Sequence, residues 1–218
     1  MALRSAVRNS AIATPPIEPL WFEWIALLGL LGFASWLLGA RGVWGLLLRS
    51  DPTGITLVII LIFGCATLWC GMRSRLMQRE RLAMAAGAGW AQDYGHALAL
   101  APRGGTTALD LLLENTHGPH GTAWWVNALL LKLGLLGKVI GFSILALQIG
   151  QIQNFDPAQS QDLLRSLTQG LGVALLTTMT GLVGNILLGL QLTRLDRYAD
   201  TLVADIQRAG LTRSAAAA

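Results

Sequence analysis

Four long apolar runs, separated by shorter polar stretches, dominate the pattern of hydrophobic and polar positions along this 218-residue chain. The runs cover residues 20–40, 54–72, 123–151 and 163–192. Each has about the 20 residues that a helix needs to cross a hydrocarbon core roughly 30 Å thick. The pattern therefore predicts an all-α, polytopic membrane protein with four transmembrane helices. The last two runs are the longest, and we expect their helices to extend into the cytoplasm.

The first run has a competing interpretation as a cleaved signal peptide. Its aromatic start, with Trp21 and Trp24, suits the interface between membrane and water. Glu23 at the edge of the apolar region and the long arm before it are unusual in a signal peptide. We therefore interpret this run as a transmembrane span.

The polar stretches divide the chain into five parts. We expect an N-terminal arm (1–19), a peripheral transmembrane hairpin (20–72), a loop with helices (73–122), a second transmembrane hairpin (123–192) and a helical tail (193–218). Inside the loop, the sequence predicts a short helix over 108–114 that loosens at Gly118, Pro119 and Gly121. In the tail, one face of an amphipathic helix carries four apolar residues: Leu195, Ala199, Leu202 and Ile206.

Basic residues predict the orientation of the spans. Eleven of the sixteen lie in the arm, the loop and the tail: Arg4, Arg8, Arg73, Arg75, Arg79, Arg81, Arg103, Arg194, Arg197, Arg208 and Arg213. Three more lie in the two links between spans or at their border: Arg41, Arg49 and Arg165. Since basic residues concentrate in cytoplasmic loops, we expect both termini and the central loop to be cytoplasmic.

Composition agrees with a membrane protein and excludes several classes of function. Only 13% of the residues are charged and 53% are hydrophobic, whereas soluble domains have about 25% charged residues. The net charge of +4 does not indicate nucleic-acid binding, because the arginines cluster at the ends of apolar runs. No catalytic pair, phosphate loop or metal set is recognisable, so we expect no enzyme activity, cofactor or metal. The three histidines, His96, His117 and His120, are expected at the surface of the loop.

The last two runs carry polar and small residues that lipid alone does not require. Residues spaced three and four apart share one face of each helix: Gly134, Lys138, Gly141, Leu145 and Gln148 on the first, and Thr178, Gly181, Asn185 and Gly189 on the second. The small or polar residues Gly137, Thr177 and Gly184 occur in the same two runs. One interpretation is close helix packing, which small residues permit in lipid. The other is that these residues line an ion path or contact a partner.

Lys138 favours the second interpretation. It stands near the middle of its run, where a charged side chain costs about 2.5–3.5 kcal/mol on insertion scales. Lys132 lies closer to the end and can extend its ammonium to the interface.

Two stretches together resemble the MotA/TolQ/ExbB proton-channel family. They are Lys-Leu-Gly-Leu-Leu-Gly-Lys-Val-Ile-Gly-Phe at 132–142 and Gly-Val-Ala-Leu-Leu-Thr-Thr-Met-Thr-Gly-Leu-Val-Gly at 172–184. The four-span layout is similar to that of MotA. The resemblance implies a homopentamer around two single-span partner chains of the MotB, TolR or ExbD kind, each with a proton-binding aspartate.

The resemblance also implies roles for individual residues. Thr178 would be the pore threonine of the last helix, with Thr177 and Asn185 beside it. Lys138 stands where the family has its other pore threonine, and Val173 stands where TolQ and ExbB have a glutamate. The implied function is a proton-channel, stator-type subunit in the bacterial inner membrane, where proton-motive force drives rotation or force on the envelope.

Two alternatives remain open. A non-conducting or gated scaffold would keep the same fold, with Lys138 blocking ion flow. A small solute transporter ranks last, because the chain shows neither an internal repeat nor a mid-span proline in its apolar runs.

Overall fold

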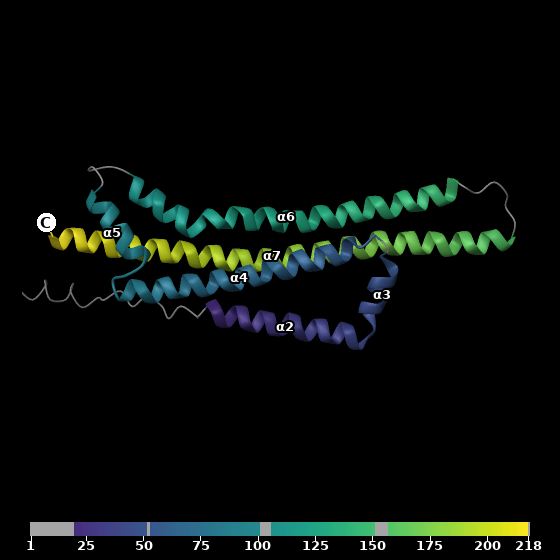
Figure 1. The fold of residues 1–218 in the computed structure, drawn as a ribbon, viewed down its shortest axis with the longest axis horizontal. Helices are drawn as coiled ribbons and strands as arrows, with labels where there is room; N and C mark the ends of the chain where they lie inside the picture. The colour runs from purple at the N-terminus through teal and green to yellow at the C-terminus, as the bar shows by residue number, and fades with distance from the viewer. Residues whose placement is uncertain (1–19, 52, 101–105, 151–156, 218) are drawn as a thin grey trace, which may run out of the picture.

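The computed structural model describes residues 20–51, 53–100, 106–150 and 157–217. These residues form six helices in the described part of the chain (Figure 1), namely α2 (Leu20–Ala40), α3 (Val43–Ser50), α4 (Ile55–Ala85), α5 (Trp90–Leu100), α6 (Thr107–Gly150) and α7 (Pro157–Ala217). The arm 1–19 lies outside the described residues.

The predicted all-α fold is confirmed for the described residues, and four of their helices have the length and apolarity predicted for spans. The helices α2, α4, α6 and α7 are each long and apolar enough to cross a membrane. The first coincides with the predicted run 20–40, whereas α4 continues past residue 72 to Ala85. The link after α2 contains the short helix α3, which the sequence analysis did not predict.

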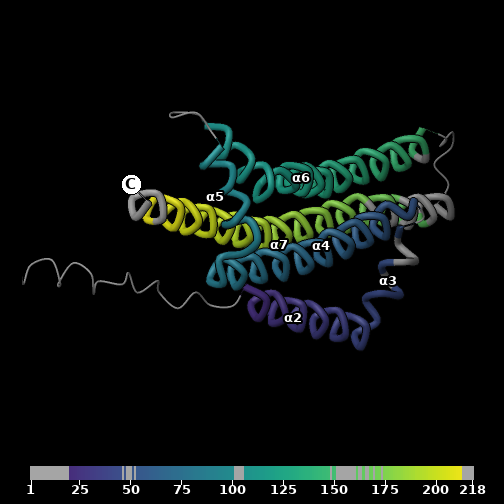
Figure 2. The backbone as a smooth tube through the Cα atoms, turned by 60° about the vertical axis from the view of Figure 1, so that its left-hand side comes forward, coloured from purple at the N-terminus to yellow at the C-terminus, as the bar shows by residue number. Residues whose placement is uncertain are grey.

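Successive membrane helices run in alternating directions along the long axis of the molecule (Figure 1). The 44 residues of α6 and the 61 residues of α7 are far longer than one bilayer crossing requires. A single crossing would therefore use only part of either helix. Helix α5 lies beside the start of α6 and the C-terminal part of α7 (Figure 2).

Apolar packing holds α4, α6 and α7 together. In the membrane part, Ile59 and Cys70 of α4 pack with Leu130 of α6 and Leu188 and Leu192 of α7. Near α5, a second cluster joins Ala91, Leu112, Leu202, Val203 and Ile206. The amphipathic face predicted for the tail is confirmed, since its four apolar residues, Leu195, Ala199, Leu202 and Ile206, are at most 1% exposed.

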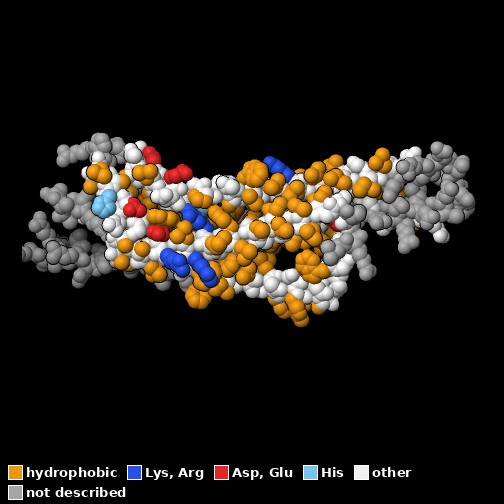
Figure 3. Space-filling view, in the orientation of Figure 1, with side chains coloured by type: hydrophobic (Ala, Val, Ile, Leu, Met, Phe, Trp, Pro, Cys, Tyr) orange, Lys and Arg blue, Asp and Glu red, His pale blue; other side chains and the backbone are white. Residues whose placement is uncertain are grey.

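Large apolar side chains also cover the outer surface of the helices (Figure 3). On α2, for example, Phe22, Leu30 and Trp36 are each about two-thirds exposed. Such a surface suits lipid or contacts with further chains, and contiguous patches of this extent are rare on soluble monomers.

The predicted break near Pro119 is wrong, because α6 runs through this residue without ending. Proline has no N–H, so the carbonyl of Asn115, four residues earlier, loses its donor within the helix. Arg73 of α4 supplies the missing donor: its Nη2 donates to the carbonyl oxygen of Asn115 and, at 3.0 Å, to that of Thr116. A contact from another helix therefore preserves a helix that the local sequence would interrupt.

Candidate functional site: the α6–α7 hairpin

Glycines bring α6 and α7 into close contact in the middle of the apolar region. A Cβ added at Gly134 would lie 3.2 Å from the Cα of Gly181, and one at Gly181 would lie 2.7 Å from the carbonyl oxygen of Leu130. A Cβ at Gly141 would lie 2.9 Å from that of Ala174. The backbones touch along this line, which we call the glycine seam (Gly134, Gly137, Gly141, Gly181 and their facing residues). A Cβ added at Gly184, one turn further on, would meet Leu130 of α6 and Phe63 of α4 at ordinary van der Waals distance.

The two threonines expected to line a pore occupy different environments. Thr177 is fully buried beside Gly137, where an added Cβ would lie 2.6 Å from the threonine Oγ1. Thr178 is partly exposed, and its hydroxyl donates to the carbonyl oxygen of Ala174 at 2.7 Å. The same hydroxyl lies 3.3 Å from the carbonyl oxygen of Gly134 across the seam. Thr178 thus combines a hydrogen bond within its helix with a link to α6.

Asn185 fastens the same two helices one to two turns away. Its Nδ2 donates to the carbonyl oxygen of Asn127 at 2.8 Å. The Oδ1 of Asn127 is buried and has no hydrogen-bond partner in the described structure. The side chain of Gln148, another predicted site residue, lies outside those described.

Lys138 lies at the border of the seam and is exposed. Its Nζ is 6.0 Å from the ring centroid of Phe142, which is 41% exposed. Lys138 follows the seam residue Gly137 by one position, and Thr178 follows Thr177 by one position. One step forward along a helix turns the side-chain direction by about 100° around the helix axis. Because α6 and α7 run antiparallel, one step forward from the contact line on either helix leads to the same side of the hairpin. Lys138 and Thr178 are therefore on one side.

Helix α4 covers the opposite side of the hairpin. Leu133, which precedes Gly134, and Val126 pack against the apolar cluster that contains Ile59 of α4, as does Phe63 of α4. The side with Lys138 has no such cover from the described helices, and its apolar residues Phe142, Leu175 and Leu182 are 41–58% exposed. We call this uncovered side the open edge: Lys138, Phe142, Leu175, Thr178 and Leu182.

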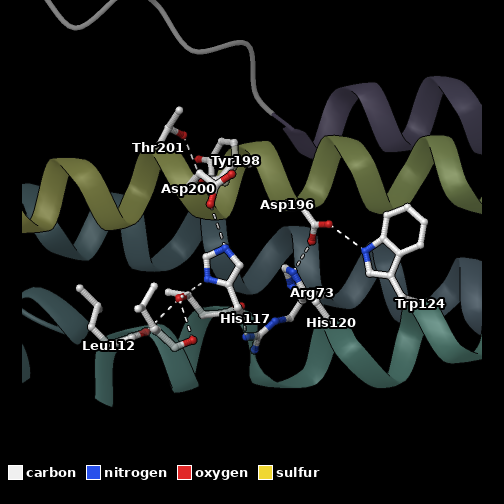
Figure 4. Close-up of polar contacts among 11 residues, drawn as sticks. Arg73, Leu112, His117, His120, Trp124, Asp196, Tyr198, Asp200 and Thr201 are labelled. Carbon is white, nitrogen blue, oxygen red and sulfur yellow. Dashed lines mark hydrogen bonds and ion pairs between the residues drawn. The ribbon is translucent and has the colours of Figure 1, made fainter. Parts of the chain in front are cut away.

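A second polar cluster, which the sequence analysis missed, joins α6 and α7 outside the glycine seam (Figure 4). His117 Nε2 lies 3.1 Å from Asp200 Oδ1, and His120 Nδ1 lies 2.6 Å from Asp196 Oδ1. The indole Nε1 of Trp124 donates to the other oxygen of Asp196 at 2.8 Å. One carboxylate thus accepts from two aromatic side chains of the facing helix.

The expectation of surface histidines is wrong for His120, which is 3% exposed. Its ring meets the ring of Trp69 edge-on, with the centroids 6.3 Å apart. The two histidines are three residues apart and the two aspartates four, so each pair lies on one face of its own helix, and this spacing was visible in the sequence. Only the pairing of α6 with α7 reveals that the two sets meet.

No group of three or more metal-ligating side chains occurs in the part of the chain that the structure describes. The histidine–aspartate contacts are hydrogen bonds between α6 and α7. Comparisons of the chain with protein-family models, with curated proteins and with solved structures found no match.

Proposed function

We propose that this chain is a proton-channel subunit of a stator-type motor in the bacterial inner membrane, with the open edge facing its partner chains. One observation carries the proposal. The residues that resemble the family's pore positions, Lys138 and Thr178, lie on the side of the α6–α7 hairpin that α4 leaves uncovered. An exposed ammonium at this depth is unfavourable against lipid and favourable against a partner's carboxylate.

The proposed assembly is a homopentamer around two single-span partners, each with one proton-binding aspartate. Thr178 and Lys138 would face the centre, while Thr177, Asn185 and the glycine seam would keep each hairpin rigid. A full elementary charge that crosses 100 mV releases about 2.3 kcal/mol, which is enough to bias a mechanical step. In this arrangement both termini and the projecting ends of α6 and α7 are cytoplasmic.

The mechanism we propose centres on Lys138. Its ammonium pairs with the partner's aspartate and holds that carboxylate in its charged form, because a nearby positive charge favours ionisation. Proton uptake by the aspartate then requires that the pair separate. Lys138 therefore retunes or locks the path that a threonine would leave open.

Proton flux through the complex, purified by a tag on this chain, tests the proposal. The complex is reconstituted in vesicles under an imposed membrane potential, and acidification is followed with an internal pH dye. We expect Lys138→Thr to raise the flux and the matched Lys132→Thr, also at an exposed lysine of α6, to leave it unchanged. Equal flux in Lys138→Thr and the unmodified complex would contradict the role of Lys138.

The mass of the intact complex in detergent tests the architecture separately. We expect five copies of this 23.3 kDa chain together with two partner chains. A monomer or dimer would contradict the proposed motor, and would indicate that the family-like residues serve helix packing alone.

A non-conducting scaffold is the second candidate, and the exposed position of Lys138 on the open edge favours it. In that case a pentamer forms and the unmodified complex carries no proton flux, whereas Lys138→Thr conducts because the side chain that blocks the path has been removed.

A further inference from the structure

A cavity of about 490 Å³ opens between α2, α4 and α7, away from the α6–α7 hairpin. It exists because α2 packs along α4 and makes few contacts with α7. Its apolar wall is formed mainly by Leu20, Ala26, Leu27 and Leu190. The volume is within the range of small-molecule sites, about 300–1,000 Å³.

Aromatic and basic residues indicate that the cavity lies at the level of the lipid headgroups. Trp21 and Trp24 of α2 stack with their centroids 4.9 Å apart, and the guanidinium of Arg75 lies 3.5 Å from the Trp21 ring centroid. Tryptophan and arginine concentrate at membrane–water interfaces. Trp24 itself lines the cavity and donates from Nε1 to the carbonyl oxygen of Thr67.

Three polar side chains of the cavity have unused capacity for a ligand. Arg194 Nε and Glu23 Oε2 are 3.9 Å apart, too far for a good hydrogen bond. Gln191 is 92% buried and its Oε1 has no hydrogen-bond partner in the described structure, while its Nε2 donates to Thr67. The set therefore offers a guanidinium for an anion, and a carboxylate with an amide oxygen for a group that donates hydrogen bonds.

We propose that this cavity binds a zwitterionic phospholipid with a primary ammonium, a phosphatidylethanolamine. Its phosphate pairs with Arg194, and its ammonium donates to Glu23 and to Gln191 Oε1. One acyl chain lies against Ala26, Leu27 and Leu190. This site is independent of the proposed channel, because it lies within a single chain and includes no residue of the open edge.

Headgroup discrimination follows from the donor count. The ammonium of phosphatidylethanolamine has three N–H donors, whereas the choline of phosphatidylcholine has none. Both lipids carry the same phosphate. Glu23 and Gln191 should therefore favour the ethanolamine lipid over the choline lipid, while Arg194 should contribute to the binding of both.

Native mass spectrometry of the full-length protein, titrated with short-chain lipids of identical acyl chains, tests the site. We expect the ethanolamine lipid to bind about tenfold more tightly than the choline lipid, as the loss of one charge-assisted hydrogen bond predicts. Glu23→Gln should reduce this preference, because only neutral amide oxygens then accept from the ammonium. Arg194→Gln should weaken the binding of both lipids. Arg208→Gln is the matched control, because Arg208 is also on α7, is also 66% exposed and pairs with Asp205.

Three outcomes would overturn the proposal. These are equal binding of the two lipids, strongest binding of an anionic phosphatidylglycerol that Glu23→Gln leaves unchanged, and equal losses in Arg194→Gln and Arg208→Gln. A photo-reactive residue at Leu27 adds a direct readout of the occupant. A lipid adduct supports the proposal, and a cross-link to a second copy of the chain shows that protein fills the cavity instead.

Discussion

The glycine seam predicts that one added methyl group at Gly181 destabilises the protein, while the same change elsewhere on the helix does not. A Cβ at Gly181 would lie 2.7 Å from the carbonyl oxygen of Leu130 and 2.9 Å from the Cα of Gly134. Both contacts are with backbone atoms, so no side-chain rotation can relieve them. Overpacking of this kind costs about 1–3 kcal/mol.

Gly172 is the matched control on α7, since a Cβ there would meet nothing within 4 Å. Both positions are inside the helix, and each gains about 0.8–1 kcal/mol of helix propensity when glycine becomes alanine. We therefore expect Gly172→Ala to be neutral or stabilising. Gly181→Ala should have a free energy of unfolding lower than that of Gly172→Ala by about 1–3 kcal/mol, the overpacking cost alone.

Unfolding of the purified protein in mixed micelles, titrated with dodecyl sulfate and followed by circular dichroism, measures both variants. Equal stability of Gly181→Ala and Gly172→Ala would refute the close approach of α6 and α7 at this position. A loss in both variants would instead indicate that Gly172 lies in a contact between chains.

Three further predictions use the same unfolding assay. Arg73→Ala should lower the free energy of unfolding by about 1–3 kcal/mol, because the carbonyl of Asn115 loses its donor. Pro119→Ala restores a backbone donor to this carbonyl, so Arg73→Ala should lower the free energy of unfolding by less in that background. An equal loss in both backgrounds would contradict the inference that Arg73 replaces the donor missing at Pro119. Asp196→Ala should lower the free energy of unfolding by about 1.5–3 kcal/mol, since His120 and Trp124 lose a charged acceptor. Asp200→Ala, at a side chain 70% exposed, should lower it by less than about 1 kcal/mol. Equal losses in the two variants would show that the two contacts are equivalent. Burial of Asp51 by itself raises its pKa, but hydrogen bonds from Thr53 and Thr56 at the start of α4 outweigh this and lower the pKa below the ordinary value of an aspartate. The carboxylate therefore stabilises the fold at neutral pH, and this contribution is lost as the pH falls below about 4; Asp51→Asn should remove that step from the pH profile of unfolding, and an unchanged profile would exclude Asp51 as its source.

Much of this architecture follows from the sequence, because transmembrane helices satisfy their own backbone hydrogen bonds and need only length and apolarity to be recognised. The run 20–40 coincides with α2, and the apolar face of Leu195, Ala199, Leu202 and Ile206 is buried as its spacing predicts. The three- and four-residue spacing of Gly134, Gly137 and Gly141 likewise indicated a packing face. Local periodicity determines these features, so the sequence is sufficient to find them.

Tertiary structure decided the features that depend on which helices meet. The helix through Pro119 persists because Arg73, 46 positions earlier, replaces its missing donor. His120 is buried because Asp196 faces it from α7. Lys138 and Thr178 share an uncovered side only because α4 packs against the other side of the hairpin. Each of these depends on contacts between residues far apart in the chain, and the periodicity of one helix does not specify its neighbours.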